Sequence, residues 1–360
     1  MNIAFDMCFT KSMSNQRGIG RYSSNMIQYI KNYDKNNFYF YFYPEFKDNH
    51  LEKQLKSFIA KNAIDIFHFT SPFEANTHRM MKKEWFGNTK IVVTLYDIIP
   101  LIFSGAYLQI ESDIKKYAKV LDFIRVCDAI LAISETTKID AITYAKMDPN
   151  KIKVILGGVD AKFKVYPTIK PPSQYGITKP YVIYTGGDDY RKNLQGIIQA
   201  FAKVNRFLEP KYQLVLVGDI SKERLYHVAA KAELAKEDLI FTGYVSDEDL
   251  VKLYNCAELF IYPSFYEGLG LPVLEAMACG VPVLTSNTSS LNEISGNAAY
   301  KVNPGNLEEI FQGLLILLKQ PNIRNSYRQK GLEHVKKFQW LNVAQRTIEV
   351  YHNLQNRETR

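Results

Sequence analysis

The sequence has few cysteines and no long apolar run. These two features argue against a disulfide-rich or zinc-binding protein and against a membrane-spanning one. Its four cysteines lie far apart and form no C-x-x-C pair: Cys8, Cys127, Cys256 and Cys279. A zinc site or a disulfide framework is therefore not expected, and a reducing compartment is the simpler inference. No apolar stretch reaches the roughly 18 residues that a membrane-spanning helix needs. Residues 1–6 have no basic region ahead of an apolar core, so they predict a strand and not a signal peptide.

The charge balance is positive, and it favours anionic ligands without identifying them. Lys and Arg outnumber Asp and Glu by 45 to 37, which gives a net charge of +8. Such an excess suits phosphorylated ligands, nucleic acid or an anionic membrane surface, and equally a merely soluble basic protein. Nucleic acid is not expected, because the aromatic residues lie in strand-like runs and not in an interleaved basic patch.

One predicted helix, at 111–126, carries a group of cations: Lys115, Lys116, Lys119 and Arg125. These side chains suit an anionic lipid surface, and an ordinary solvated helix face is the equal alternative. We expect a cytoplasmic protein, with peripheral binding to the inner face of the plasma membrane as a second location.

Short apolar runs alternate with amphipathic stretches along the chain, which is typical of parallel α/β domains. The predicted strands before the middle of the chain are 2–6, 38–43, 65–69, 91–96, 129–133 and 153–156. A stretch rich in proline, 166–179, is the best linker. Beyond it the predicted strands are 181–185, 213–217, 239–242 and 259–262. We therefore expect an N-terminal domain over 1–168 and a C-terminal domain over 169–338, both doubly wound, with ligands beyond the carboxyl ends of the strands.

The most informative segment is 265–284, FYEGLGLPVLEAMACGVPVL, which follows a predicted strand. Its loop contains Gly268 and Gly270, and Pro272 lies where a helix would begin. Gly280 would close that helix before the next strand. The start of such a helix presents free N–H groups and the positive end of the helix dipole to an anion. The glycines would let a ligand approach the backbone closely.

Two glutamates bracket this unit, with seven residues between them: Glu267 in the loop and Glu275 in the expected first helical turn. Ionisation of a carboxylate near a helix N-terminus is favoured by about 0.3–1 kcal/mol. A charged Glu275 can accept two hydrogen bonds from the vicinal hydroxyls of a ribose. Taken alone, the spacing is more typical of an ordinary helix-start carboxylate and a surface glutamate.

The complete string closely resembles the E-x7-E signature of glycosyltransferase family 4, retaining enzymes with two Rossmann-like domains. Other segments are similar to the same family, most specifically 186–193 (GGDDYRKN), 214–219, 241–250 and 289–294, and more loosely 18–22 (GIGRY), 93–100 and 132–134. The resemblance implies an α/β protein of the GT-B class, with two doubly wound domains and an interdomain cleft. It also implies that a last helix within 339–360 crosses back onto the N-terminal domain.

The resemblance implies a donor site built from matching residues. Lys192 would bind the donor diphosphate with Arg191 beside it, and both would stabilise charge that develops on the leaving group. Glu267 would lie nearest the donor sugar, and Glu275 would bind the ribose. The other implied donor-site residues are Gly18, Gly20, Gly187, Tyr244, Val245, Gly268, Leu269, Gly270 and Leu271. A solvated Arg-Lys pair, and core packing for Tyr244 and Val245, are the alternatives.

The acceptor side departs from the family, because Tyr96-Asp97 stands where relatives usually have His-Asp. A phenol has a reference pKa of about 10, so we expect Tyr96 to orient a substrate and not to take a proton. Asp97 closes an apolar strand and is expected to bind the acceptor, with a turn-forming role as the alternative. His68 is a third acceptor candidate, with simple packing as the alternative. The expected catalytic residues are Asp97, Glu267, Arg191 and Lys192.

The resemblance implies retaining transfer of a hexose from a nucleotide-diphosphate sugar to a glycan or lipid-linked glycan, without a cofactor or metal. No D-x-D motif follows a predicted strand in a metal-binding context. The GGxxxRKN and GIGRY segments are similar to those of bacterial mannosyl- and rhamnosyltransferases, which favours GDP-mannose or dTDP-rhamnose. A UDP-sugar is an alternative donor, and a nucleotide-sugar epimerase of the same architecture is the alternative of another class.

Overall fold

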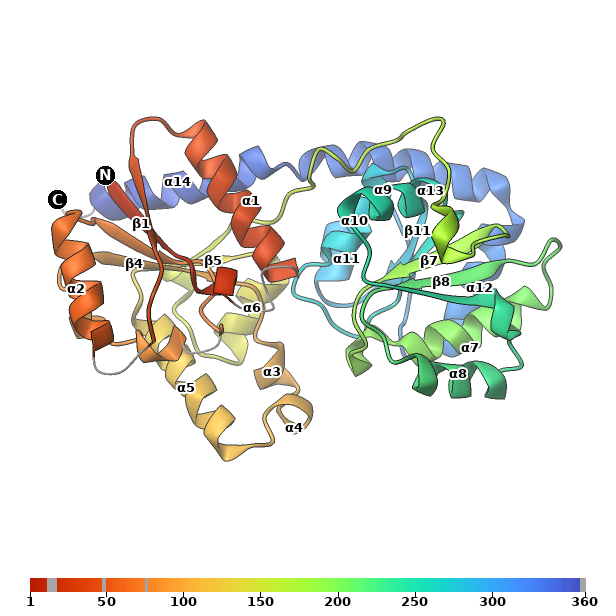
Figure 1. The fold of residues 1–360 in the computed structure, drawn as a ribbon, viewed down its shortest axis with the longest axis horizontal. Helices are drawn as coiled ribbons and strands as arrows, with labels where there is room; N and C mark the ends of the chain where they lie inside the picture. The colour runs from red at the N-terminus through yellow and green to blue at the C-terminus, as the bar shows by residue number, and fades with distance from the viewer. Residues whose placement is uncertain (12–17, 47–49, 75–76, 357–360) are drawn as a thin grey trace. The chain divides into compact units, whose positions relative to one another are not determined.

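The computed structural model describes residues 1–11, 18–46, 50–74 and 77–356, which form two compact units (Figure 1). The first unit is Met1–Gly158 together with Gln339–Arg360, and the second is Val159–Phe338. The division thus lies at Gly158, ahead of the expected boundary at residue 168. The C-terminal segment belongs to the first unit although the second unit separates them in sequence.

The first unit is an α/β layered domain around a parallel six-stranded sheet with the order β2-β1-β3-β4-β5-β6. Its strands are β1 (Asn2–Asp6), β2 (Phe38–Phe42), β3 (Ile66–Phe69), β4 (Lys90–Leu95), β5 (Ala129–Ala132) and β6 (Ile152–Val154). Its α-helices are α1 (Gly18–Tyr33), α2 (Leu51–Lys61), α3 (Ile99–Ile102), α4 (Ser104–Tyr107), α5 (Glu111–Val126), α6 (Glu135–Thr143) and α14 (Trp340–Asn356). The direction of winding changes between β1 and β3, which makes this the switch point of the sheet.

The second unit repeats the plan with the order β12-β11-β10-β7-β8-β9, again parallel. Its strands are β7 (Tyr181–Thr185), β8 (Gln213–Val217), β9 (Leu239–Gly243), β10 (Leu259–Tyr262), β11 (Val283–Ser286) and β12 (Tyr300–Val302). Its α-helices are α7 (Leu194–Asn205), α8 (Lys222–Lys231), α9 (Asp247–Asn255), α10 (Leu271–Ala278), α11 (Ser289–Ser295), α12 (Leu307–Lys319) and α13 (Pro321–His334). Here the switch point lies between β7 and β10.

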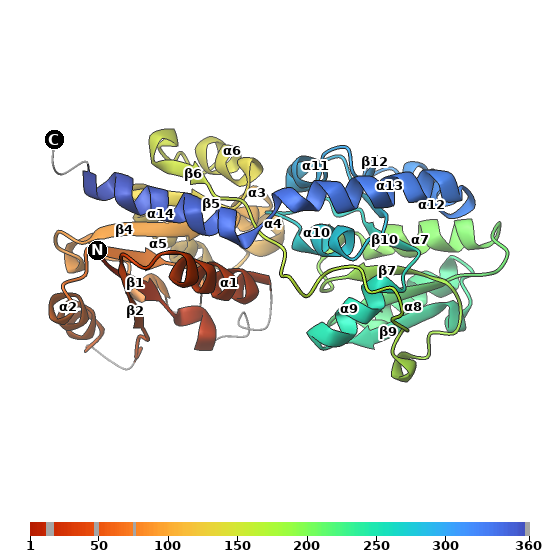
Figure 2. The same ribbon diagram turned by 90° about the horizontal axis from the view of Figure 1, so that it is seen from above.

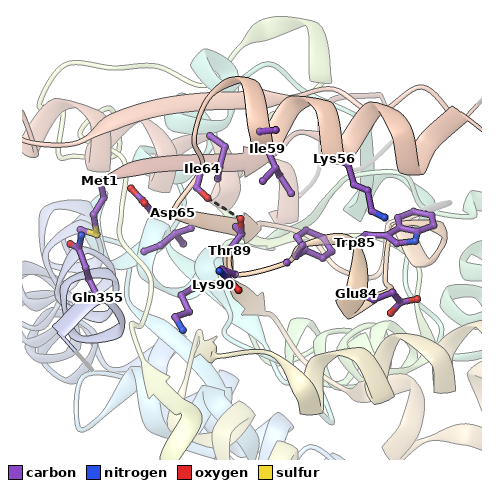
Figure 3. A pocket seen from close by; sticks show the side chains of 15 residues that line it. Met1, Lys56, Ile59, Ile64, Asp65, Glu84, Trp85, Thr89, Lys90 and Gln355 are labelled. Carbon is purple, nitrogen blue, oxygen red and sulfur yellow. Dashed lines mark hydrogen bonds between the residues drawn. The ribbon is translucent and has the colours of Figure 1, made fainter. Parts of the chain in front are cut away.

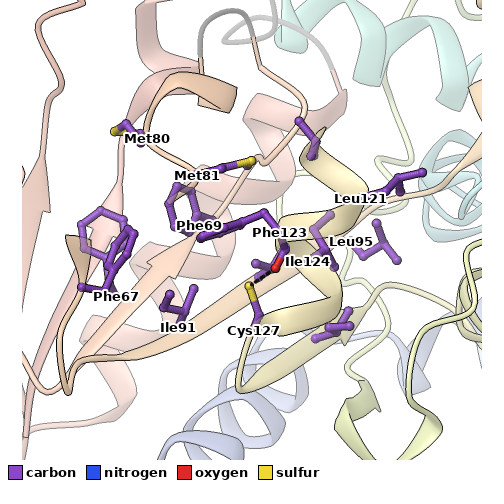
Figure 4. Packing of buried hydrophobic residues seen from close by; sticks show 14 of the residues in the cluster. Phe67, Phe69, Met80, Met81, Ile91, Leu95, Leu121, Phe123, Ile124 and Cys127 are labelled. Atoms are coloured by element: carbon purple, nitrogen blue, oxygen red, sulfur yellow. Dashed lines mark hydrogen bonds between the residues drawn. The ribbon is translucent and has the colours of Figure 1, made fainter. Parts of the chain in front are cut away.

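The strands are apolar because helices cover both faces of each sheet. Every residue of β7 and β8 is buried. In the first unit, side chains from β3 and β4 pack against α5 in one cluster (Figure 4). Phe69 and Phe123 meet there edge to face, with ring centroids 5.4 Å apart. Such aromatic pairs add about 0.5–1.5 kcal/mol beyond the burial of their area.

The C-terminal helix α14 runs beside α1 in both views of the ribbon (Figures 1 and 2). On α14 the side chains of Trp340, Val343, Ile348 and Tyr351 are buried. Gly158 marks the start of this packing: a Cβ placed there would lie only 2.4 Å from the backbone nitrogen of Trp340. A side chain at Gly158 would therefore push the helix away from the first unit.

The expected strand and helix bounds mostly agree with the structure to within one or two residues. β1, β7, β8 and β10 have the expected bounds. The strand expected after Gly280 is β11, which begins at Val283. The short edge strand β12 was not expected, because three residues carry too weak a pattern to be recognised.

Candidate functional site

A buried ion cluster lies at the switch point of the second unit, where β7 and β10 end. Lys192 donates to one carboxylate oxygen of Glu267 at 2.6 Å, and Arg191 donates to the other at 2.7 Å. The two cations come from a short 3-10 turn after β7, and Glu267 comes from the loop after β10. The side chains of Lys192, Arg191 and Glu267 are only 12%, 19% and 8% exposed, respectively. Arg191 and Lys192 are therefore not a solvated surface pair.

The ionisation of the cluster follows from burial and from mutual attraction. Burial disfavours the charge on Glu267, but Lys192 and Arg191 outweigh it and lower the pKa of the carboxyl group. Burial also lowers the pKa of Lys192, although Glu267 opposes this. For Arg191 burial is the largest single influence and would lower the pKa, but Glu267, Tyr262 and Asp189 together outweigh it and raise the pKa. Arg191 is also paired with Asp189, whose Oδ1 lies 3.5 Å from its Nε, so two cations face two carboxylates in this cluster.

Two features of this cluster were not expected from the sequence. The Tyr262 hydroxyl accepts a hydrogen bond from the Lys192 ammonium at 2.6 Å. Asn193 adopts a left-handed conformation, and its side chain donates to the carbonyl oxygens of Pro263 and Pro304. Tyr262 is the last residue of a predicted strand, and this position alone could have indicated a side chain at the site.

Glu275 is buried in the second turn of α10, and not in the first turn as expected. Because α10 begins at Leu271, the dipole contributes less to Glu275 than the sequence suggested. The Tyr254 hydroxyl lies 3.4 Å from its Oε2 and 2.8 Å from the hydroxyl of Thr185, at the end of β7. Tyr254 therefore links Glu275 to the strand that precedes the cations.

The loop before α10 packs closely against α11. Gly270 has a φ of +99°, and a Cβ placed there would lie 2.5 Å from Leu291. Leu269 is buried, and its carbonyl oxygen accepts from Ser290. The expected residues Gly268 and Leu271 lie in the same loop and helix start, with Pro272 as the second helical residue.

The remaining residues that were expected to bind the donor in the second unit differ in burial and in backbone constraint. Gly187 has ordinary backbone geometry, and a Cβ placed there would have no neighbour within 4 Å. Tyr244 is 71% exposed, whereas Val245 is buried. The structure thus assigns Val245 a packing contact and leaves Tyr244 at the surface after β9.

The first unit places Tyr96 and Asp97 at the end of β4, beside a cavity of about 590 Å³. The Tyr96 hydroxyl is within 2.6 Å of the Ser23 hydroxyl and donates to the carbonyl of Thr70 at 2.9 Å. Burial raises its pKa, which agrees with an orienting role. Asp97 accepts a hydrogen bond from the backbone N–H of Ile99 at 2.9 Å and also lines the cavity. The same side chain therefore stabilises the turn and is available to a ligand in the cavity.

His68 corrects the expectation of an acceptor-binding histidine. It is fully buried, with one ring nitrogen 2.6 Å from the Tyr351 hydroxyl and the other 2.8 Å from the Thr94 hydroxyl. Burial lowers its pKa to about 3. His68 is neutral at physiological pH and packs β3 against α14. The geometry therefore favours a packing role for His68 over acceptor binding.

Gly18 and Gly20 both lie in the first turn of α1. Gly20 is buried, and a Cβ at Gly18 would have no neighbour within 4 Å. Arg17, the residue before this turn, lies outside the described residues. The glycine pair opens the helix as expected, at the carboxyl end of the sheet.

The cations of α5 are largely compensated within the helix. Lys115, Lys116 and Arg125 each pair with a carboxylate three or four residues earlier. These pairs weaken the case for a cationic membrane-binding face. Across the described ranges, no helix is both long and apolar enough to cross a bilayer.

A second cavity, of about 480 Å³, lies at the opposite end of the strands of the first sheet (Figure 3). Residues at the amino ends of its strands line it, including Met1, Asp65 and Lys90. Thr89 donates to the carbonyl of Ile64 at its wall. No residue expected to bind a substrate lies there, which agrees with ligand binding at carboxyl ends.

Two family models account for most of the chain. Residues 28–163 match the model described as Glycosyltransferase Family 4, and residues 167–334 match the model described as Glycosyl transferases group 1. The chain belongs to this glycosyltransferase family. The predicted family is confirmed, and the ion cluster lies in the group 1 part of the transferase.

Curated relatives of the transferase include enzymes named for mannose transfer. The serotype-specific mannosyltransferase WbdA of Escherichia coli is 31% identical over 306 residues, which are 82% of this chain and 38% of that protein. The O-antigen chain mannosyltransferase B of Escherichia coli is 39% identical over 174 residues, which are 48% of this chain and 45% of that protein. The matched residues cover less than half the length of either relative.

Solved structures confirm the predicted fold. Sucrose-phosphate synthase from Thermosynechococcus elongatus superposes with a TM-score of 0.77 at 19% identity, covering 99% of both chains. Anabaena HepE, solved in complex with UDP-glucose, superposes with a TM-score of 0.78 at 17% identity, covering 98% of this chain and 100% of that one. The transferase therefore has the two Rossmann-like domains of the GT-B class.

Proposed function

We propose that the transferase moves a hexose from a nucleotide-diphosphate sugar to a glycan or lipid-linked glycan, with retention of anomeric configuration. The ion cluster of Arg191, Lys192 and Glu267 is the observation that carries this proposal. It combines two ordered cations with a helix start at the switch point of a doubly wound sheet, where such folds bind nucleotides.

The geometry supports binding and stabilisation of a departing diphosphate. Glu267 holds both cations in place, so their N–H groups need little rearrangement when phosphate oxygens arrive. The guanidinium group of Arg191 and the ammonium group of Lys192 favour the negative charge that develops on the leaving group. In this proposal the same carboxylate contacts the donor sugar, and Glu275 binds the ribose hydroxyls.

Mannose from GDP-mannose is the donor that we favour, because the relatives in Escherichia coli are named mannosyltransferases. Rhamnose from dTDP-rhamnose and a UDP-sugar are the alternatives. Arg191 and Lys192 supply the charge that a metal ion would otherwise bring to the diphosphate, so we propose a reaction without metal or cofactor.

The acceptor, in this proposal, binds in the first unit near Tyr96 and Asp97. A cytoplasmic location fits a nucleotide-sugar donor. Peripheral binding to the inner face of the plasma membrane is the alternative location, although Lys115, Lys116 and Arg125 of α5 pair with carboxylates of the same helix.

A thermal-shift screen against GDP, UDP, dTDP and ADP tests the donor class directly. We expect one nucleoside diphosphate to raise the melting temperature well above the effect of free sugars or oligonucleotides, because ligand that binds only the folded state stabilises it. The nucleotide sugar of that base is then incubated with glycan acceptors, and the product anomer is determined by NMR. Interconversion of nucleotide sugars without transfer would instead support the epimerase alternative.

A further inference from the structure

The cavity beside Tyr96 and Asp97 has the position and size of a small-ligand site. It lies at the carboxyl ends of β3 and β4, next to the switch point of the first sheet, and its other walls are α3, α4 and α5. Its volume of about 590 Å³ falls within the range of about 300–1,000 Å³ that is typical of ligand pockets.

One wall of this cavity is aromatic. The rings of Phe73 and Tyr117 are stacked, with centroids 4.8 Å apart and an interplanar angle of 18°, and Tyr107 and Leu108 continue the apolar surface. The face of an aromatic ring carries partial negative charge. It therefore suits the C–H groups that line one face of a pyranose ring, which carry partial positive charge.

The polar wall of the cavity is acidic, although the whole chain has a net charge of +8. Three carboxylates line it, from Glu74, Asp97 and Asp113, against one ammonium group, from Lys116. Lys116 lies 3.1 Å from Asp113 and so is already paired. His78 also lines the cavity, and burial together with the nearby cations Lys119, Lys116 and Arg79 lowers its pKa, which disfavours the charged imidazole.

Carboxylates accept hydrogen bonds from sugar hydroxyls but repel phosphate and carboxylate groups. A divalent cation is a poorer fit to the acidic wall. Within the part of the chain that the structure describes, no group of three or more His, Cys, Asp or Glu side chains is arranged to hold a metal ion.

We infer that this cavity binds a neutral pyranose, the terminal sugar of the acceptor, and excludes a terminal sugar that carries phosphate or carboxylate. Phe73 and Tyr117 hold the apolar face of the ring, and Glu74 and Asp113 set the discrimination against negative charge. This inference rests on the proposed function, because it names the acceptor class of that transferase.

Ligand-observed NMR titration of the full chain tests the inference. The probes are the methyl α-glycosides of mannose, glucose and galactose, each compared with its 6-phosphate. We expect at least one neutral glycoside to bind saturably and its 6-phosphate to bind about tenfold more weakly or worse, because like charges disfavour binding. Binding of the phosphate as tight as that of its neutral partner, or failure of all three neutral glycosides to bind, would overturn the inference.

Matched variants show whether this cavity is responsible. Tyr117→Ala should weaken binding of the neutral glycoside by about tenfold, whereas Tyr117→Phe should retain it, because the Tyr117 hydroxyl is buried without a hydrogen-bond partner among the described residues. Tyr144→Ala, at a 52% exposed tyrosine outside the cavity, is the control. Equal loss in Tyr117→Ala and Tyr144→Ala contradicts the assignment.

The double variant Glu74→Gln and Asp113→Asn decides the question even where Tyr117→Ala does not fold. It should reduce the preference for the neutral glycoside over its 6-phosphate to about threefold or less, since the repelling charges are gone. An unchanged preference contradicts the inference. Binding of nucleoside diphosphate is measured on the same samples: if the wild type binds it but no glycoside, this inference alone fails, and if no nucleoside diphosphate binds, the proposed function fails.

Discussion

Glu267 is the residue on which the ion cluster depends, because each of its carboxylate oxygens holds a different cation. Removing one partner from such a buried arrangement leaves charge without compensation, which is far costlier than the loss of a surface pair. A substitution of Glu267 would therefore disturb the fold around both cations as well as their positions. Binding tests on the cluster should change Lys192 and leave Glu267 in place.

Lys192→Ala should weaken binding of nucleoside diphosphate more than binding of the nucleoside, because the lysine contacts phosphate in the proposed function. Glu275→Ala should weaken both, since it removes a charged partner of the ribose that is worth about 1.5–3 kcal/mol. Isothermal titration of nucleoside and nucleoside diphosphate gives the four affinities. Wild-type affinity for nucleoside diphosphate in both variants would remove these residues from the donor site.

Tyr96 and Asp97 should differ in their effect on turnover. Tyr96→Phe should keep substantial activity, because the raised pKa of the phenol excludes a role as base and its hydroxyl contacts Ser23 and Thr70. Asp97→Asn should cost more, up to the 10²–10⁴-fold, roughly, that one positioned acid–base group contributes. Turnover is compared at saturating donor, with the fold checked by circular dichroism. An inactive Tyr96→Phe beside a nearly normal Asp97→Asn would reverse the two roles.

His68 should make the folded state sensitive to acid. Its folded pKa of about 3 lies below its ordinary value, so as pH falls below about 6.5 the unfolded chain binds a proton that the folded chain does not. The free energy of unfolding then falls by up to about 1.4 kcal/mol per pH unit, or about 2.7 kcal/mol by pH 4.5. Above pH 6.5 both states are neutral at this residue, and the effect vanishes.

Denaturant unfolding of wild type and His68→Gln at pH 7.5 and 4.5 measures this contribution. The variant loses the hydrogen-bond geometry of the ring and should be less stable at pH 7.5. It should nevertheless lose less stability than the wild type between the two pH values. An equal loss in both proteins would mean that His68 does not supply the acid sensitivity.

At the scale of elements, Gly187 follows β7 and Gly218 follows β8, and the two positions differ in whether the fold would accept a side chain there. Gly218 has a φ of +133°, and a Cβ there would lie 2.0 Å from the carbonyl oxygen of Gly186. Gly187 has neither constraint, since a Cβ there would meet nothing within 4 Å. The fold therefore requires Gly218, whereas only a ligand would require Gly187.

Gly218→Ala should lower the free energy of unfolding by about 1–3 kcal/mol or more, because backbone must move to admit the methyl group. Gly187→Ala should leave stability within about 0.5 kcal/mol of the wild type, as surface substitutions do, and yet weaken donor binding. Thermal unfolding and nucleoside-diphosphate titration separate the two effects. Wild-type donor affinity in Gly187→Ala would place this loop away from the donor.

At the scale of the whole molecule, the proposed reaction draws its charge stabilisation from the protein itself. Activity should survive exhaustive treatment with EDTA, because Arg191 and Lys192 occupy the position of charge that a metal ion would otherwise fill. The measurement is the initial rate with and without chelator, followed by addition of Mg²⁺ or Mn²⁺. A loss of activity that either ion restores would contradict a metal-independent mechanism.

Much of the fold could be predicted because it depends on local patterns. The wholly buried β7 has the predicted bounds, and the amphipathic α14 lies within the predicted range 339–360, since their patterns are complete within the segment itself. The E-x7-E segment and the GGxxxRKN segment likewise carried enough local identity to indicate the family. The short β12 and the starting residue of α10 could not be predicted from such patterns. The helix begins at Leu271, one residue before the expected Pro272, and this moves Glu275 out of the first turn.

The sequence by itself determined the two α/β domains, the family, and which residue types gather after the strands. Only the tertiary structure decided how those residues meet. Lys192 and Glu267 are 75 residues apart in the chain and share a hydrogen bond because β7 and β10 are neighbours in the sheet. His68 became a packing residue because α14, 283 residues further along the chain, covers it with Tyr351. Charge pairing and burial depend on these long-range neighbours, and no local pattern encodes them.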